Sequence, residues 1–322
     1  MGSRREEFMI DVEQRPPRAR RTATVPARWL ALASAVLLVV VACGWIPGVV
    51  GTAVSAVLPW LGLVLLALLI SALFLARRVI VLVLVPALLW ALAMVPALPG
   101  MPSPSTPESA SASELTVVSQ NVRARSGGAA ASAAELARSD ADVIALVELD
   151  GDSLAVAQDA LAAEYPHSYT VGTVGVWSRY PLSSAEPLTL GLGWKRAIRV
   201  EVQAPETPVA VYVLHAASVR PGHQHDRDTM LGGLADQIAA DSAASLIAVG
   251  DFNAPSTDPS LAALRAEAEW VRPTDGTLGF TWPVAFPLVR IDHVFVRGLD
   301  VVSSSTLRAG NSDHLATTTR VR

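Results

Sequence analysis

Ser245-Leu246-Ile247-Ala248-Val249-Gly250-Asp251-Phe252-Asn253 is the stretch that decides the fold. Residues 245–249 form a short apolar run that predicts a buried strand, and Gly250 is expected to end it. Asp251 and Asn253 then lie together at the end of that strand, where a carboxylate and a carboxamide can hold a metal or activate and orient one water molecule. Gly, Asp and Asn are also the residues that ordinary turns use, so this stretch alone leaves a plain turn open.

Other predicted strands carry polar residues at their ends in the same way. Apolar runs at 115–119, 143–147, 174–178, 198–203, 209–214 and 289–296 predict strands, and a last strand follows residue 314. Helices are predicted at 130–139 and 227–240. The polar residues that accompany these strands are Asn121, Glu148, His215, Asp251, Asn253, Asp292, Asp313 and His314. Each has an ordinary explanation as a turn residue, a solvated end or a buried histidine, but their shared position favours a single site.

The N-terminal third of the chain has the composition of membrane helices. Between residues 29 and 98 the only charged residues are Arg77 and Arg78. Apolar runs at about 29–50, 54–76 and 79–98 each approach the ~20 residues that cross a bilayer as a helix. Residues 1–28 carry seven arginines and predict a disordered basic tail. The positive-inside rule then predicts a multi-pass protein of the plasma membrane, with a cytoplasmic N-terminus and the C-terminal domain outside.

The only cysteine, Cys43, lies inside the first apolar run. Val40-Val41-Ala42-Cys43 leaves a cleaved lipoprotein signal open, but the two further apolar runs favour a small residue packed in a membrane helix. Residues 99–113 are rich in Pro, Ser and Ala and predict a linker. Residues 114–322 form the remaining domain, which contains no cysteine and therefore no disulfide.

The motifs of this domain, taken in order, resemble those of the endonuclease/exonuclease/phosphatase (DNase I-like) superfamily, in its membrane-anchored bacterial branch. The similarity extends over about residues 115–319 and rests on Ser-Gln-Asn-Val, Asp-Val-Ile-Ala-Leu-Val-Glu, Ser-Arg-Tyr-Pro, Leu-His, Gly-Asp-Phe-Asn, Arg-Ile-Asp-His-Val-Phe-Val and Ser-Asp-His. The resemblance implies an α/β (α+β) four-layer sandwich, in which two packed β-sheets are flanked by helices, here preceded by three transmembrane helices. It also implies hydrolysis of a phosphate ester by in-line attack of water, with Mg²⁺ or Mn²⁺ as cofactor.

The same resemblance assigns roles to individual residues. It implies metal ligation by Asn121, Glu148 and Asp313, and catalytic roles for His215, Asp251, Asn253, Asp292 and His314. Asp251 would activate the water with the help of Asn253, and His314 would contact the scissile phosphate with its tautomer held by Asp292. His215 would be a second histidine on the phosphate. Val147 precedes Glu148 where the family usually has Gln, and this departure puts nuclease specificity in doubt.

Charge bears on the substrate. Residues 114–322 contain 16 Arg and Lys against 24 Asp and Glu, a net charge of −8, which disfavours nucleic acid as the partner. The sequence leaves open a local basic patch around Lys195, Arg196 and Arg199. It also leaves open stacking on a headgroup by aromatic residues near the expected mouth of the site, although a place in the core is the favoured interpretation for them: Trp194, Phe280 and Trp282.

The sequence thus predicts a membrane-tethered, magnesium-dependent phosphoesterase that hydrolyses a phosphate ester or diester outside the cytoplasm. A lipid-linked phosphate is the favoured substrate because the tether keeps the site near the bilayer. The alternatives are an extracellular metal-dependent nuclease and an inactive binding or sensing module on the same fold.

Overall fold

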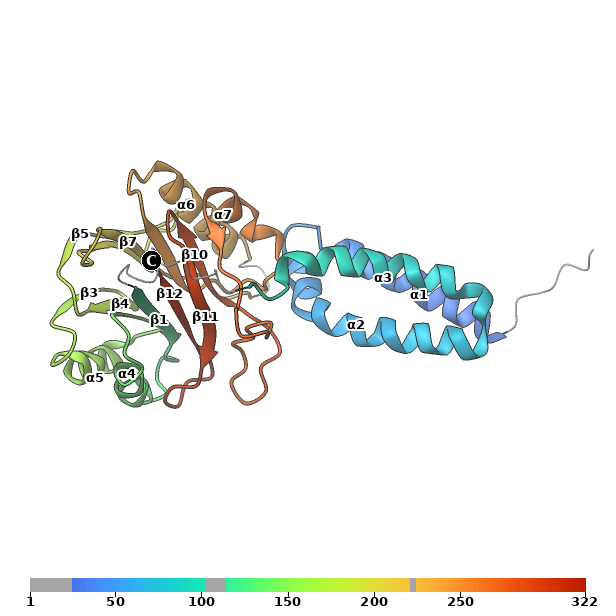
Figure 1. Cartoon of the computed structure of the whole chain (residues 1–322), viewed down its shortest axis with the longest axis horizontal. Helices are drawn as coiled ribbons and strands as arrows, with labels where there is room; N and C mark the ends of the chain where they lie inside the picture. The colour runs from blue at the N-terminus through green and yellow to red at the C-terminus, as the bar shows by residue number, and fades with distance from the viewer. Residues whose placement is uncertain (1–24, 102–113, 221–223) are drawn as a thin grey trace, which may run out of the picture.

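Three apolar helices precede the domain in this computed structural model, which describes residues 25–101, 114–220 and 224–322. They are α1 (Val25–Cys43), α2 (Val49–Leu75) and α3 (Ile80–Met94), with 3₁₀ turns η1 (Arg77–Val79) and η2 (Val95–Ala97) on either side of α3. They lie side by side as a bundle at one end of the molecule (Figure 1). Large apolar side chains cover its outside, which suits lipid rather than water. The spans Val25–Cys43, Val49–Leu75 and Arg77–Ala97 are long and apolar enough to cross a membrane.

The bounds of the helices differ from the predicted apolar runs. α1 begins at Val25, so the last residues of the predicted tail are helical. Residues 44–48 separate α1 from α2, and Gly48 has a φ of 93°, a conformation that glycine adopts at little cost. The rest of the predicted tail and most of the predicted linker lie outside the described residues.

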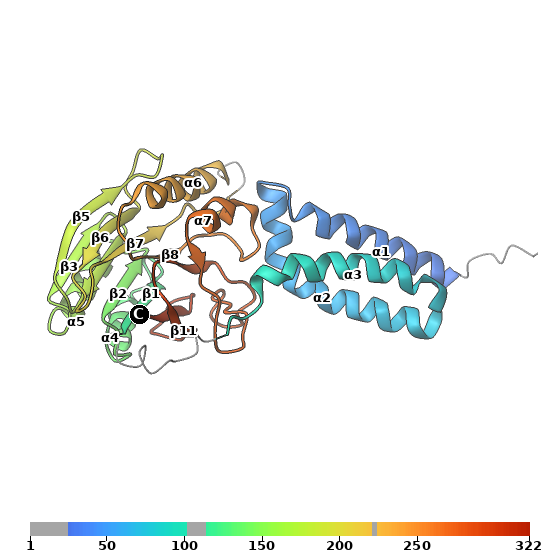
Figure 2. The same ribbon diagram turned by 45° about the horizontal axis from the view of Figure 1, so that its top comes forward.

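Two six-stranded mixed sheets form the centre of the domain (Figure 2). The first has the order β11-β12-β1-β2-β4-β3 and the second β5-β6-β7-β8-β10-β9. The strands of the first sheet are β1 (Leu115–Asn121), β2 (Val143–Val147), β3 (His167–Val171), β4 (Val174–Ser178), β11 (Val301–Leu307) and β12 (Ala316–Val321). Those of the second are β5 (Leu182–Leu188), β6 (Ala197–Val202), β7 (Val209–His215), β8 (Leu246–Asp251), β9 (Glu269–Trp270) and β10 (Asp292–Arg297).

The two sheets pack face to face through a core dominated by valine. Val117 and Val143 of the first sheet and Val211, Ile247 and Val294 of the second belong to this buried layer. Alternate residues of each strand point to the opposite face, which is covered by helices. The helices are α4 (Ala129–Ala137) and α5 (Gly151–Leu161) on the first sheet, and α6 (Gln224–Ala240), the 3₁₀ turn η4 (Pro259–Leu261) and α7 (Ala262–Glu267) on the second. The predicted four-layer arrangement is confirmed.

The strand and helix predictions differ from the structure in two places near the site. Gly250 does not end its strand, because β8 continues to Asp251. Gly250 instead has a φ of 137° and lies so close to β7 that a Cβ would meet the carbonyl oxygen of Leu214. The strand predicted at 289–296 begins at Asp292, since Val289 forms an isolated bridge with Trp282.

Candidate active site

The sheet topology brings the predicted site residues to one edge. β1 runs parallel to β2, and β7 runs parallel to β8, so the carboxyl ends of each pair lie together. β10 runs antiparallel to β8, and its first residue, Asp292, pairs with Asp251, the last residue of β8. His215 ends β7 directly opposite Asp251 on the other side. The sequence pattern therefore becomes one cluster, because the ends of the parallel pairs meet the beginning of the antiparallel strand β10.

Asn121 connects the two sheets within this cluster. Its Nδ2 donates to Oδ2 of Asp251 at 3.0 Å, and its Oδ1 accepts from the backbone N–H of Arg123 at 2.9 Å. Asn121 ends β1 in the first sheet, whereas Asp251 ends β8 in the second. Both side chains are buried, so this hydrogen bond fixes the two sheet edges relative to each other.

Glu148 follows β2 and remains accessible at the cluster. Its Oε1 lies 3.3 Å from Nε2 of His215, and its Oε2 accepts from the backbone N–H of Ala124 at 3.3 Å. The hydrogen bond from His215 is the main cause that lowers the pKa of Glu148 to about 2, although burial acts in the opposite direction. Glu148 is therefore a carboxylate at neutral pH, with 28 % of its side chain exposed. It is available as a ligand for a cation.

Asp251 is buried and held from several directions. Its Oδ1 accepts from the backbone N–H of Asn253 at 2.9 Å, while the Asn253 amide donates to the carbonyl oxygen of Ala216 at 3.1 Å. Asn253 has a φ of 49°, a conformation that Asn tolerates better than most residues. Burial, followed by the negative charge of Asp292, raises the pKa of Asp251 to about 7. Asp251 can therefore exchange a proton near neutral pH.

His314 and Asp292 form a buried pair. Nδ1 of His314 lies 2.9 Å from Oδ2 of Asp292, and the His314 backbone N–H donates to Oγ of Ser312 at 3.0 Å. Burial is the largest influence on His314 and opposes its protonation. The charge and hydrogen bond of Asp292 outweigh it with help from Asp251, and together they raise the pKa of His314 to about 10. The imidazole is thus protonated at neutral pH, with Nε2 left to face a ligand.

The donor set of this cluster fits a divalent cation. The carboxylates of Asp251 and Asp292 and the imidazole of His314 converge, with one side-chain atom of each within 4.8 Å of the others. Because the imidazole is protonated, the cluster offers a cation the oxygen atoms of its carboxylates and of Asn121 rather than a nitrogen of His314. Two buried carboxylates so close together repel each other, and a cation beside them relieves that repulsion. Carboxylate and carboxamide oxygens are also the ligands that Mg²⁺ prefers. The tightest group thus differs from the predicted metal ligands, because it contains neither Glu148 nor Asp313.

Asp313 lies at the rim rather than within the buried group. Its carboxylate is 36 % exposed, and its Oδ2 lies 4.0 Å from Nε of Arg123. Its backbone oxygen accepts from the N–H of Val284 at 2.7 Å, so the residue also anchors a neighbouring loop. Its predicted role as a metal ligand stays a prediction.

Arg196 is a site residue to which sequence reasoning gave no role. Its Nη2 lies 2.7 Å from Nδ1 and 2.8 Å from Nε2 of His215. Burial is the main cause that lowers the pKa of His215, and the guanidinium of Arg196 lowers it further. A neutral His215 that donates from Nε2 to Glu148 and accepts at Nδ1 from Arg196 satisfies all three groups.

The signal in the sequence that could have pointed to Arg196 is the basic patch that the sequence leaves open around Lys195, Arg196 and Arg199. Only part of that patch belongs to the site, because Arg199 pairs instead with Asp241 at 2.7 Å. Trp194 is 55 % exposed, and its ring lies 5.1 Å from the Arg196 guanidinium. Trp194 therefore accompanies the site rather than the core, which is the less favoured of the two alternatives from the sequence.

Comparison with known proteins agrees with this geometry. The sequence model described as "Endonuclease/Exonuclease/phosphatase family" matches residues 118–314, more than half of the chain. A search of curated protein sequences finds no match.

Several solved structures share the fold of the domain. Truncated TDP2 of Caenorhabditis elegans is 21 % identical with a TM-score of 0.55, and the match covers 65 % of this chain and 97 % of that one. D. rerio TDP2 complexed with a single-strand DNA product is 18 % identical with a TM-score of 0.53, and the match covers 66 % of this chain and 100 % of that one. A beta toxin of Staphylococcus aureus is 15 % identical with a TM-score of 0.51, and the match covers 64 % of this chain and 99 % of that one. Identities this low show the fold alone.

Proposed function

Because the chain belongs to the endonuclease/exonuclease/phosphatase family, we propose that it is a membrane-anchored, metal-dependent phosphoesterase with its domain outside the cytoplasm. Its proposed substrate is a phosphate ester or diester of a membrane lipid. The observation that carries the proposal is the convergence of Asn121, Glu148, Asp251, Asp292 and His314 at one sheet edge, from strands of both sheets.

In this proposal Asp251 and Asn253 prepare the attacking water. A carboxylate with a pKa of about 7 is basic enough to take the proton of water as the oxygen attacks phosphorus in line with the departing ester oxygen. Asn253 orients the same water, and its amide is fixed by the carbonyl oxygen of Ala216. The proton thus goes to Asp251, and the bond between phosphorus and the leaving oxygen breaks.

The cationic side chains stabilise charge on the phosphate. The protonated His314, held by Asp292, donates to a phosphoryl oxygen as negative charge develops there. Arg196 donates to another phosphoryl oxygen, and His215 orients this guanidinium. A divalent cation held by Asn121 and Glu148 would add positive charge against the phosphoryl oxygens.

A loop between the bundle and the site supports a substrate in the membrane surface. Nε1 of Trp60, in α2, donates to the carbonyl oxygen of Leu288 at 2.9 Å, and its ring lies 5.8 Å from that of Phe280. Tryptophan is typical of the boundary between lipid and water, so the loop at 280–289 is expected at that level. The same loop is hydrogen-bonded to the carbonyl of Asp313, next to His314.

This loop also exposes apolar side chains beside the site. Trp282 is 41 % exposed, Phe286 67 % and Leu288 37 %. Apolar residues exposed together at the rim of a site mark a surface that binds lipid or protein. Their attachment to a membrane helix favours lipid.

Nucleic acid is the second candidate because D. rerio TDP2, a structural neighbour, is seen with a single-strand DNA product. The net charge of −8 over residues 114–322 speaks against it, since proteins that grip nucleic acid present a basic surface. Both candidates use the same site chemistry, so only a substrate comparison separates them.

The test is hydrolysis by the full-length chain in nanodiscs, offered phospholipids, polyprenyl phosphates, sugar phosphates and single-stranded DNA. We expect a lipid phosphate to be hydrolysed, the reaction to stop in excess chelator, and Mg²⁺ or Mn²⁺ to restore it. Glu148→Gln should lower turnover by roughly 100-fold because it removes an anionic ligand. Glu186→Gln, which makes the same change at an exposed position of β5, should have no effect.

Undiminished turnover in excess chelator would refute the metal mechanism. Preference for DNA over every lipid would replace the lipid substrate by the nuclease alternative. Failure to hydrolyse any substrate, with the fold intact, would indicate a binding or sensing module.

A further inference from the structure

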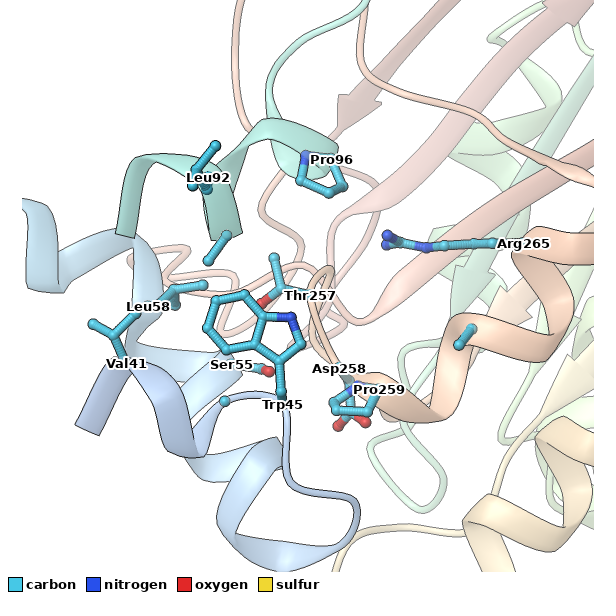
Figure 3. A pocket seen from close by; sticks show the side chains of 13 residues that line it. Val41, Trp45, Ser55, Leu58, Leu92, Pro96, Thr257, Asp258, Pro259 and Arg265 are labelled. Carbon is cyan, nitrogen blue, oxygen red and sulfur yellow. The ribbon is translucent and has the colours of Figure 1, made fainter. Parts of the chain in front are cut away.

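A cavity lies away from the candidate active site, where the helical bundle meets the domain (Figure 3). Its volume is about 210 Å³. At ~30 Å³ for each water molecule of the liquid, it has room for part of a larger ligand rather than for a few waters only. It is lined from the bundle by Val41, Trp45, Ser55, Leu58 and Leu92, and from the domain by Thr257, Asp258 and Arg265.

The wall on the side of the bundle is apolar and continuous with the surface that faces lipid. Leu58 is buried at the base, whereas Trp45 is 53 % and Leu92 59 % exposed. Both exposed residues lie at the domain end of the predicted spans, where acyl chains meet headgroups. A lipid chain can therefore reach the cavity without crossing water.

The cavity also contains buried polar atoms that have no hydrogen-bond partner among the described residues. These atoms are Oγ of Ser55, Oγ1 of Thr257 and Nε of Arg265. Ser55 is only 3 % exposed, so water at the protein surface does not satisfy it. An unsatisfied buried donor or acceptor is costly, and three around one cavity indicate a polar ligand.

The charge of the lining favours an anion. Asp258 is already paired, since its Oδ2 accepts from Thr52 at 2.6 Å and from Nη1 of Arg227 at 3.1 Å, although this guanidinium also pairs with Asp228 at 2.6 Å. Arg265 has no carboxylate within ion-pair distance among the described residues. Its other contacts are a hydrogen bond from Nη2 to the carbonyl oxygen of Ser256 and the ring of Trp270, 4.7 Å away. Arg265 is thus an uncompensated charge of the cavity, and Figure 3 shows its guanidinium pointing towards Thr257.

We propose that this cavity binds an anionic phospholipid. A phosphate oxygen accepts from Nε of Arg265, the hydroxyls of Ser55 and Thr257 bond to other headgroup oxygens, and an acyl chain packs on Leu58 and Leu92. The lipid so bound joins the bundle to the domain at the membrane surface. It is a site separate from catalysis and does not depend on the proposed reaction.

The test is a titration of phosphatidylglycerol into the detergent-solubilised full chain in excess chelator, with bound lipid counted by native mass spectrometry. We expect one retained phosphatidylglycerol and much weaker retention of phosphatidylcholine. Arg265→Gln should weaken binding roughly 10-fold to 100-fold, the usual effect of losing a hydrogen bond to a charged group. Arg138→Gln, which removes the same charge from an exposed position after α4, is the matched control and should bind normally.

Two further measurements test whether the lipid occupies this cavity and whether its chains are needed for binding. Ala262→Phe should abolish binding, because it fills the cavity from α7 while Arg265 remains. Glycerol phosphate, which has the headgroup charge without chains, should not displace the lipid at equal concentration.

Normal binding by a correctly folded Arg265→Gln, complete displacement by glycerol phosphate, or equal retention of phosphatidylcholine would each overturn the proposal. Loss of the lipid in His314→Ala but not in Arg265→Gln would locate it in the active site instead.

Discussion

At the scale of single residues, the main feature of the site is that two carboxylates and one imidazole are buried next to one another. Asp251 and Asp292 are each 2 % exposed and lie on neighbouring strands. The single protonated imidazole of His314 balances one carboxylate and leaves the other with a pKa of about 7. The same cluster therefore contains a base, Asp251, whose pKa is raised by burial and by the charge of Asp292, and a proton donor, His314, on which burial acts in the opposite direction but the charge of Asp292 outweighs it.

The pair formed by Asp292 and His314 can be tested by a double-mutant cycle. His314→Ala should lower turnover by roughly 10² to 10⁴, the usual effect of losing an acid or base. Asp292→Asn should cost less, since the ring remains but loses its orientation and charge. The double variant should be little worse than His314→Ala, because the two residues act as a unit.

Turnover of all three variants is compared with their thermal unfolding. If the fold-decrease in turnover of the double variant equals the product of the two single decreases, the two residues act independently. Unfolded single variants would show that the loss of activity is structural.

Arg196 should act mainly on substrate binding. Arg196→Gln should raise KM roughly 10-fold to 100-fold with a smaller effect on kcat, because a hydrogen bond from a charged donor to the phosphate is lost. Arg196→Lys should restore part of the affinity, and Lys195→Gln, at the exposed neighbouring position, should change neither constant. Steady-state kinetics on the substrate found in the panel measures all three; an unchanged KM in Arg196→Gln would remove this residue from the phosphate site.

At the scale of elements, one buried acid fastens α6 to the second sheet. Oδ2 of Asp241, just after α6, accepts from Nε of Arg199 in β6 at 2.7 Å and from the hydroxyl of Tyr212 in β7 at 2.6 Å. Burial opposes the charge of Asp241 and is the largest single influence. The hydrogen bonds from Arg199 and Tyr212 together outweigh it and lower the pKa of Asp241 to about 2.

This shift predicts a pH dependence of stability. The folded pKa lies below the ordinary 3.8, so the carboxylate contributes stability that is fully present above about pH 4 and lost as pH falls towards 2. The shift corresponds to about 2 kcal/mol. Asp241→Asn should therefore lower the free energy of unfolding by about 2 kcal/mol at pH 7 and by much less at pH 2.

Urea unfolding of the full chain in detergent, followed by tryptophan fluorescence, measures both values. Asp236→Asn, a change of the same kind on the exposed side of α6, serves as the control. An equal decrease in the free energy of unfolding at pH 7 and pH 2 would show that Asp241 stabilises the fold through packing rather than through its charge.

At the scale of the whole molecule, the bundle and the domain are joined by buried polar groups as well as by apolar packing. Oγ1 of Thr52, near the start of α2, donates to Asp258, which also accepts from Arg227. The same guanidinium donates to the carbonyl oxygen of Asn253 at 3.1 Å. The apolar helices are thus connected through three hydrogen bonds to the backbone of Asn253, a proposed site residue.

The orientation of the molecule is testable with fusions. A reporter that is active only outside the cytoplasm should work when fused after Leu98, and one that is active only inside should work when fused near Arg77. The reason is that positive charge is retained on the cytoplasmic side of each span. The opposite pattern would contradict both the three-span topology and the external position of the domain.

The central strands could be predicted from the sequence, whereas the edge strands could not. All eight predicted strands lie inside the sheets, where both faces are covered and apolar runs result. The strands at the edges are β3, β5, β9 and β11, and they are more polar, as Ser303-Ser304-Ser305 in β11 shows. α5 was also missed, although Asp150 caps it by accepting from the N–H of Ser153.

The sequence by itself determined the three apolar helices, the central strands and the polar residues that follow them, because burial requires local runs of apolar side chains. It did not determine which of those polar residues touch, since that depends on strand direction and on pairing between residues far apart in the chain. Arg196 has no local signal that separates it from Arg199, yet one lies against His215 and the other against Asp241. The raised pKa of Asp251 likewise exists only because β10 brings Asp292 beside it. Only the tertiary structure decided these contacts, because the energy of a charge depends on the atoms that replace water around it.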